Sequence, residues 1–110
     1  MLGINGKLFD WRLIDIPAIE HQPGVVALLA RHGRLDGEIL DAVVAKDMNA
    51  AAERYATSGC LRRNEPGVVV GILTRCTVDK GVAASIVESL QRSRWVRIAE
   101  ADGPEAREWF

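Results

Sequence analysis

The chain has 110 residues, with 14 Lys and Arg, 15 Asp and Glu, and 48% hydrophobic residues. This length suffices for one hydrophobic core, so we expect a single domain over residues 1–110, and no apolar segment approaches the roughly 18 residues of a membrane span. A net charge of −1 argues against a protein that binds polyanions over its whole surface. The first residues lack the basic start and long apolar stretch of a secretion signal, so we expect a cytoplasmic protein.

The first 22 residues are interpreted as an N-terminal arm and a connector. Within them, residues 7–14 alternate in part between apolar and polar, which favours a short strand or an extended arm laid across the core. A turn at residues 22–24 ends the connector, and residues 25–30 (VVALLA) then form an unbroken apolar run. A strand with one wet face alternates, so this run predicts an interior strand that is covered on both faces.

Residues 36–57 are compatible with two assignments. One is a single long helix over the whole stretch. The other is a strand over residues 38–44, followed by a helix over residues 48–57 that Asp47 caps. The alanine-rich second half has high helix propensity, whereas EILDAVV carries the β-branched residues typical of strands and follows a turn. We favour the strand followed by the helix.

Residues 66–91 hold the clearest pattern in the chain. Val68 to Leu73 is an apolar block interrupted only by Gly71, which predicts a second interior strand. Thr77 or Asp79 is expected to cap the helix that follows, because short oxygen-bearing side chains satisfy free N–H groups at a helix start. The apolar residues of this helix recur at helical spacing and form one face, composed of Val82, Ala83, Ile86, Val87 and Leu90.

The remaining residues complete the predicted fold. Residues 95–99 (WVRIA) alternate and predict an edge strand, and residues 100–110 are interpreted as a C-terminal tail. Together these elements predict an α+β fold, with a small mixed or antiparallel sheet of three to five strands and two main helices packed on it.

Side chains suited to catalysis or metal binding form no recognisable set in the sequence. His21 and His32 have no second histidine or carboxylate at ligand spacing, and Cys60 and Cys76 match no zinc pattern. Nucleophile motifs and glycine-rich phosphate loops are absent. We expect no cofactor. The carboxylates of the first half are scattered as on a solvated face, at Asp36, Glu38, Asp41 and Asp47.

Basic residues are concentrated in the second half of the chain. Between Ser58 and Arg97 there are seven bases and three acids, a local excess of four. Arginine pairs with phosphate through its planar fork, and an exposed tryptophan stacks on a base. Candidate nucleic-acid contacts are therefore Arg62, Arg63, Arg92, Arg94, Trp95 and Arg97. The alternative is that Trp95 lies in the core while the arginines solubilise a helix end and an edge strand.

The layout from Phe9 onward resembles a GIY-YIG domain, over most of the chain. Residues 23–26 (PGVV) are similar to the first strand of that family, and residues 39–44 lie where its second strand is expected. Residues 47–55 (DMNAAAERY) resemble its first helix, and residues 68–90 resemble its third strand with the helix that follows.

The resemblance implies a phosphodiester-cleaving ancestry. That family uses two motif tyrosines, a helical arginine and a metal-holding glutamate, and the matching positions here are Arg54 and Glu88. Val26 stands where the first motif tyrosine would be, and residues 38–45 contain no tyrosine. The resemblance therefore implies a fold retained without its nuclease chemistry. Under the alternative of an active nuclease, Mg²⁺ or Mn²⁺ would be the cofactor.

These observations lead to three functional hypotheses. The first is a non-catalytic binding or interaction module whose partner is another protein, a second copy of the chain or nucleic acid, with no membrane contact. The second is a metal-dependent nuclease with displaced catalytic residues, Arg54 and Glu88. The third is a structural homo-oligomer whose interface buries Trp95, Trp109 and Phe110.

Overall fold

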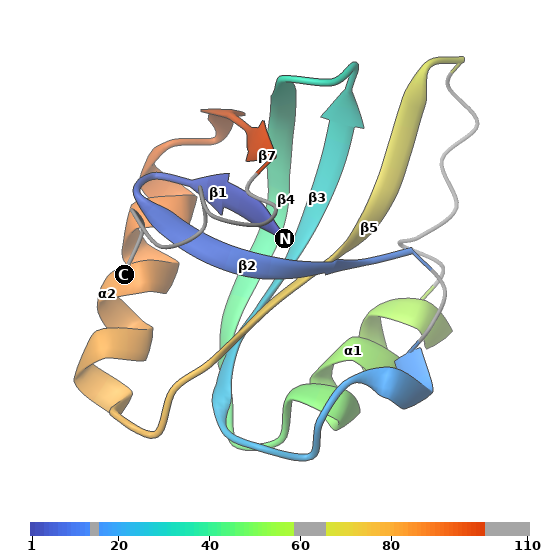
Figure 1. The fold of residues 1–110 in the computed structure, drawn as a ribbon. Coiled ribbons are helices and arrows are strands. Elements are labelled where there is room, and N and C mark those ends of the chain that lie inside the picture. The colour runs from blue at the N-terminus through green and yellow to red at the C-terminus, as the bar shows by residue number, and fades with distance from the viewer. Residues whose placement is uncertain (14–15, 59–65, 101–110) are drawn as a thin grey trace.

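The chain forms seven β-strands, two α-helices and one short 3₁₀ helix, as shown in Figure 1. This computed structural model describes residues 1–13, 16–58 and 66–100. The elements in chain order are β1 (Leu2–Ile4), β2 (Lys7–Arg12), η1 (Ile16–Ala18), β3 (Gly24–His32), β4 (Asp36–Ala45), α1 (Met48–Thr57), β5 (Val68–Cys76), α2 (Lys80–Arg92), β6 (Trp95–Arg97) and β7 (Ala99–Glu100).

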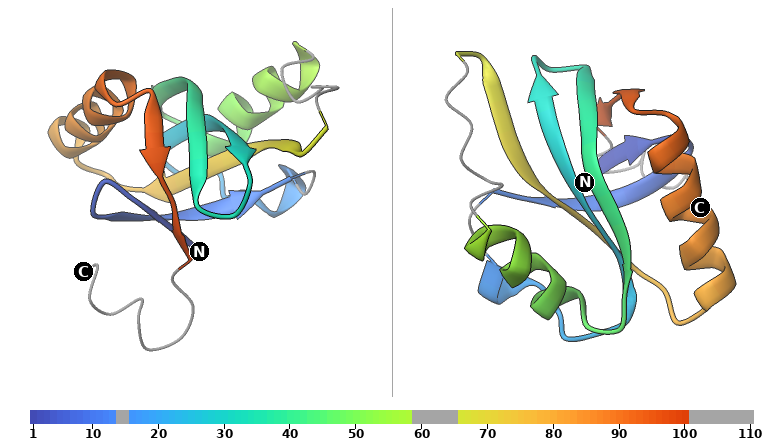
Figure 2. Two further views of the ribbon diagram at one scale, coloured as in Figure 1. Left: turned by 90° about the horizontal axis from the view of Figure 1, so that it is seen from above. Right: turned by 180° about the vertical axis from the view of Figure 1, so that it is seen from behind.

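The strands form one antiparallel sheet that curls into a nearly closed barrel. Its strand order is β6-β4-β3-β5-β2-β1-β7. Only Ile98 separates β6 from β7, yet β6 pairs with β4 at one edge and β7 pairs with β1 at the other. Residues 95–100 therefore bridge the two edges of the sheet. Figure 2 shows the resulting curvature from above, and a register shift between Leu28 and Leu29 in β3 adds to the bend.

The prediction of a sheet with three to five strands is wrong, because the described residues form seven. The arm predicted over residues 1–22 contains two paired strands, and the edge strand predicted over residues 95–99 is two short strands on different partners. Strands of two or three residues are too short to show alternation in a sequence. They form here because curling of the sheet brings two free edges within reach of one segment.

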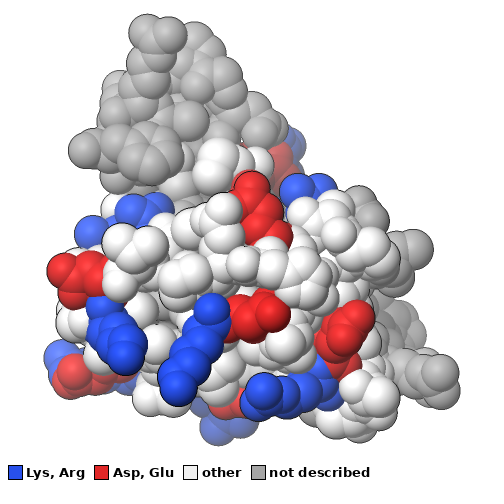
Figure 3. Space-filling view, turned by 90° about the horizontal axis from the view of Figure 1, so that it is seen from below, with Lys and Arg blue, Asp and Glu red and all other residues white. Residues whose placement is uncertain are grey.

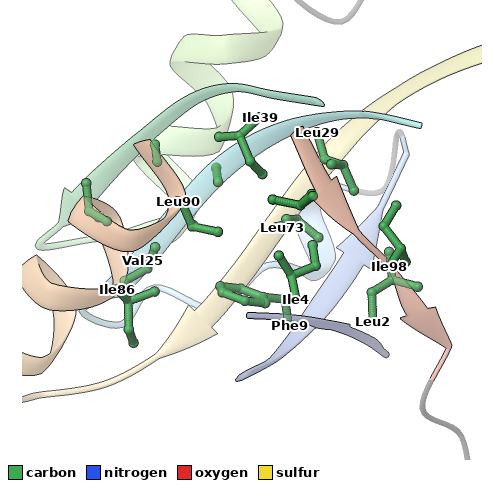
Figure 4. Packing of buried hydrophobic residues seen from close by; sticks show 14 of the residues in the cluster. Leu2, Ile4, Phe9, Val25, Leu29, Ile39, Leu73, Ile86, Leu90 and Ile98 are labelled. Carbon is green, nitrogen blue, oxygen red and sulfur yellow. The ribbon is translucent and has the colours of Figure 1, made fainter. Parts of the chain in front are cut away.

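Strand β3 is buried on both faces, which explains why its sequence is apolar without interruption. Val25, Ala27 and Leu29 point into the barrel, where they join a core that includes Phe9 and Leu73. Figure 4 shows Val25 and Leu29 in this core. The alternate residues Val26, Leu28 and Ala30 point outward into a second core under α1 and η1. All six residues are at most 2% exposed. The prediction of an interior strand covered on both faces is confirmed.

The two α-helices lie against opposite faces of the sheet. Helix α1 packs on the outer face through Ala51 and Ala52, whereas α2 packs on the inner core through Ile86 and Leu90. Figures 1 and 2 show the two helices on different sides of the strands. In the described part of the chain, neither helix is long and apolar enough to cross a membrane.

Both helix starts agree with the sequence predictions. The Asp47 carboxylate accepts a hydrogen bond from the Ala50 N–H at 3.2 Å, so residues 36–57 are a strand followed by a capped helix. The Asp79 carboxylate accepts from the N–H groups of Gly81 and Val82 at 2.8 and 3.1 Å. These caps fix the direction in which each helix leaves its loop.

Candidate functional site

The end of the molecule where both helices begin carries the candidate site. Strands β4 and β5 both pair antiparallel with β3, so they run parallel to each other and reach the same end of the sheet. Backbone hydrogen bonds tie the loops there together, from the Thr77 N–H to the Pro23 carbonyl at 3.1 Å and from the Met48 N–H to the Gln22 carbonyl at 2.9 Å. These bonds hold three loops side by side around the end of β4.

Two cavities flank the end of β4, and we call them together the β4-end groove. One lies toward α2, has a volume of about 360 Å³, and is lined by Pro23, Gly24, Val44, Ala45, Lys46, Thr77, Val78, Lys80, Ala83 and Ala84. The other lies toward α1, has a volume of about 400 Å³, and is lined by Val43, Val44, Ala45, Lys46, Asp47, Ala50, Ala51 and Arg54. The cavities share the last strand residues and Lys46, and their sizes fall within the range of ligand pockets.

The walls of the groove are mainly apolar and exposed. Val78 is 82% exposed and Val44 is 47% exposed, and both line the cavity toward α2. Gly24 forms part of the same wall, and a Cβ atom there would lie 2.3 Å from the Arg75 carbonyl oxygen. Larger side chains are therefore excluded at residue 24 by the backbone of β5.

The rim of the groove is basic, and its cations have no partner in the part of the chain that the structure describes. Lys46, Arg54 and Lys80 line the groove, and none of their side chains makes an ion pair or hydrogen bond with any described residue. Asp47 is the carboxylate that lines the groove against these three cations. Figure 3 views the molecule from this side and shows Lys and Arg side chains lying over uncharged surface, with acidic side chains between them.

Asp47 is already engaged by its neighbours. The His21 ring donates from Nδ1 to both carboxylate oxygens, at 3.0 and 3.1 Å. This hydrogen bond, followed by the one from the Ala50 N–H, holds the pKa of the Asp47 carboxyl below its ordinary value. Asp47 therefore stays ionised but directs its oxygens to His21 and the start of α1.

A second region surrounds Trp95, at the start of β4, and we call it the Trp95 surface (His32, Glu38, Arg94, Trp95 and Arg97). Trp95 is 63% exposed and packs on the His32 ring, with centroids 5.0 Å apart. Glu38 is buried, with Arg94 Nε at 3.3 Å and His32 Nε2 at 3.7 Å from its oxygens. Arg97 projects from the same side of β6 as Trp95, opposite Asp36.

The predicted nucleic-acid contacts are thus brought together only in part. Arg94, Trp95 and Arg97 share one surface, while Arg92 ends α2 and pairs with Glu88 one turn earlier. Arg62 and Arg63 lie outside the described residues, as do Trp109 and Phe110 of the predicted oligomer interface. The alternative in which Trp95 belongs to the core does not hold, because most of its side chain is exposed.

The two residues of the nuclease hypothesis lie in different parts of the molecule. Arg54 is on α1 and lines the β4-end groove, whereas Glu88 is on α2 and lines a separate cavity with Arg92. Across residues 1–13, 16–58 and 66–100, no group of three His, Cys, Asp or Glu side chains is arranged to hold a metal ion. The resemblance to the GIY-YIG family stays a prediction.

Sequence reasoning did not identify the β4-end groove. Lys46 and Lys80 each follow a strand and lie next to a capping aspartate, which was a usable signal. The two lysines lie together because β4 and β5 both pair with β3. Local sequence pattern does not predict which distant strands pair.

Comparison of the chain with known protein families, with curated proteins and with solved structures finds no match. The functional argument therefore depends on the site itself.

Proposed function

We propose that this protein is a non-catalytic binding module that holds an acidic segment of a partner protein in the β4-end groove. The observation that carries the proposal is the combination of exposed apolar walls, at Val44 and Val78, with three cations that have no partner among the described residues. Large contiguous apolar patches that soluble proteins leave exposed usually mark interaction sites.

The two kinds of surface serve different parts of recognition. Burial of the valine walls favours the complex, because removing apolar surface from water is favourable. Lys46, Arg54 and Lys80 select an acidic partner and raise its association rate, because complementary potentials steer the encounter. Helix starts at Met48 and Lys80 place further N–H groups at this end of the molecule.

The proposal is tested by selecting a displayed library of random 12-residue peptides on the whole chain. We expect the enriched peptides to combine Asp or Glu with apolar residues. Binding of the best peptide should weaken at least tenfold in the double variant Lys46→Glu, Lys80→Glu. The matched control is Lys7→Glu, because Lys7 is also exposed and without a partner among the described residues but lines a different cavity.

Three outcomes of this selection would contradict the proposal. They are a library that yields no enriched peptide, enriched peptides without acidic residues, and a double variant that binds as tightly as the Lys7→Glu control. Circular dichroism of each variant shows whether the fold is kept.

A second candidate function is binding of single-stranded nucleic acid on the Trp95 surface. Its support is the exposed Trp95 ring, which His32 packs against from one side, with Arg97 projecting from the same face of the strand. Aromatic rings of this kind stack on bases whatever the sequence.

Labelled single-stranded DNA and RNA, titrated against salt with and without Mg²⁺ or Mn²⁺, test this second function. Binding that weakens steeply with salt is expected, and Trp95→Ala and the triple alanine variant of Arg92, Arg94 and Arg97 should each reduce it at least fivefold. Absence of binding at low salt would eliminate it, and metal-dependent cleavage would favour the nuclease hypothesis instead.

A further inference from the structure

One edge of β4 has hydrogen-bond partners along its first part and none among the described residues along its last part. Strand β6 pairs with β4 only over Asp36–Glu38, so no strand in the described part of the chain pairs with residues 39–45 on this side. The first part of that stretch is nonetheless covered. The Ile39 N–H donates to the Arg94 carbonyl at 2.7 Å, and the Ala42 carbonyl accepts from Gln91 Nε2 at 3.3 Å.

Beyond Ala42 the edge is open. In an antiparallel strand the N–H and C=O of every second residue point to the same edge. Because the Ala42 carbonyl points to Gln91 on α2, the N–H and C=O of Val44 point to this same edge. No side chain or loop backbone among the described residues bonds to Val44. Val44 is also 47% exposed.

The two cavities of the β4-end groove lie on opposite faces of this open edge. One is walled by α2 and the other by α1, and both are lined by Val44, Ala45 and Lys46. Successive side chains of an extended strand point to opposite faces of a sheet. A strand added at Val44 would therefore send alternate side chains into the two cavities, which is the geometry of peptide recognition by strand addition.

We infer that the acidic partner segment binds as a short added β-strand, with its backbone paired to Val44 and its side chains divided between the two cavities. This inference rests on the proposed function. Charge complementarity decides the occupant, since Lys46 and Lys80 line one cavity and Lys46 and Arg54 line the other. A second copy of the chain is disfavoured, because its own edge at residues 43–46 (VVAK) carries a cation and no carboxylate.

The first test removes the backbone donor. Val44→Pro deletes the N–H that a bound strand would use, and Val44→Thr is the matched control because it keeps the N–H and the β-branched shape. With the best peptide from the library selection as probe, Val44→Pro should weaken binding at least tenfold and Val44→Thr less than threefold. Proline is tolerated on edge strands, and the midpoint of thermal unfolding shows whether each variant is folded.

The second test leaves the protein unchanged. Each backbone nitrogen of the same peptide is methylated in turn, and methylation should weaken binding at alternate positions only, near the point of contact. In parallel, hydrogen exchange of the Val44 amide should slow at least tenfold when the peptide is bound.

The outcomes separate the two proposals. A peptide that needs Lys46 and Lys80 but tolerates Val44→Pro and methylation at every position would overturn strand addition and leave the binding function standing. Absence of any enriched peptide would overturn both. Failure of Val44→Pro to fold moves the decision to the methylated peptides and the Val44 exchange rate, which use the wild-type chain.

Discussion

The two ends of β4 both carry cations, but the cations differ in what they contact. At the Trp95 surface, Arg94 is held by the buried carboxylate of Glu38, and nearby Arg92 is held by Glu88. At the β4-end groove, Lys46 and Lys80 have no carboxylate partner among the described residues. Charge that is already paired contributes to the fold, whereas charge left unpaired beside apolar walls is available to a partner. The contrast between Arg94 and the two lysines teaches that ion pairing, more than the local count of bases, distinguishes the cations of the two regions; Arg97, with no ion pair among the described residues, is the exception at the Trp95 surface.

The largest expected effect concerns closure of the barrel beside the Trp95 surface. Ile98 is 1% exposed and its N–H donates to the Leu35 carbonyl at 2.6 Å. Ile98→Ala should lower the free energy of unfolding by about 2–4 kcal/mol, because it leaves a cavity in the core. Val44→Ala in the groove should cost less than about 1 kcal/mol, since Val44 is half exposed. Urea denaturation measures both losses. Equal losses would contradict the view that residues near the Trp95 surface stabilise the fold while the groove is kept for binding.

A medium effect is expected at Glu38. Glu38→Gln removes the charge that Arg94 and His32 contact, and it should lower the free energy of unfolding by about 1–2 kcal/mol. The expected loss is small because the Arg94 side chain is 71% exposed and water screens its charge. Lys46→Gln is the control at the groove and should change stability by about 0.5 kcal/mol or less. A larger loss of unfolding free energy from Lys46→Gln than from Glu38→Gln would contradict the view that the charge at Glu38 stabilises the fold and the charge at Lys46 does not.

The smallest effect is a pH dependence at the rim of the groove. The hydrogen bond from His21 lowers the pKa of Asp47 in the folded state, so the unfolded state binds more protons as the pH falls. Asp47 therefore adds stability above its ordinary carboxyl pKa and loses it as the pH falls through the lowered value.

Asp47→Asn isolates this contribution, because asparagine also caps helices but does not ionise. The difference in unfolding midpoint between wild type and Asp47→Asn should shrink between about pH 5 and about pH 2. A difference that grows with acidification would show that His21 does not lower the pKa of Asp47.

Individual elements of the fold could be predicted from the sequence, for physical reasons that are local. The unbroken apolar runs gave the interior strands β3 and β5, and the aspartates at residues 47 and 79 gave both helix starts. The closure of the barrel could not be predicted. It depends on pairing of residues 95–100 with strands that are more than fifty residues away, and short strands carry no periodicity of their own.

The candidate sites were predictable to a different degree. Trp95 and its neighbouring arginines were found from composition, but exposure of the Trp95 ring and pairing of Arg94 with Glu38 are tertiary facts. The groove was missed because Lys46 and Lys80 are far apart in the chain and each is unremarkable alone. The two lysines reach one end of the sheet because β4 and β5 both pair with β3.

Bridging of the sheet edges by residues 95–100 also bears on how the chain folds. Leu2 pairs with Glu100, so the last described strand is hydrogen-bonded to the first. Contacts between residues so distant in sequence require closing a long loop before any of its stabilisation is gained, and proteins rich in such contacts fold slowly. During synthesis, the hairpin of β3 and β4 and the helix α1 have their partners early. Strand β1 also has its hairpin partner β2 early, but its pairing with β7 must wait until β7 has left the ribosome.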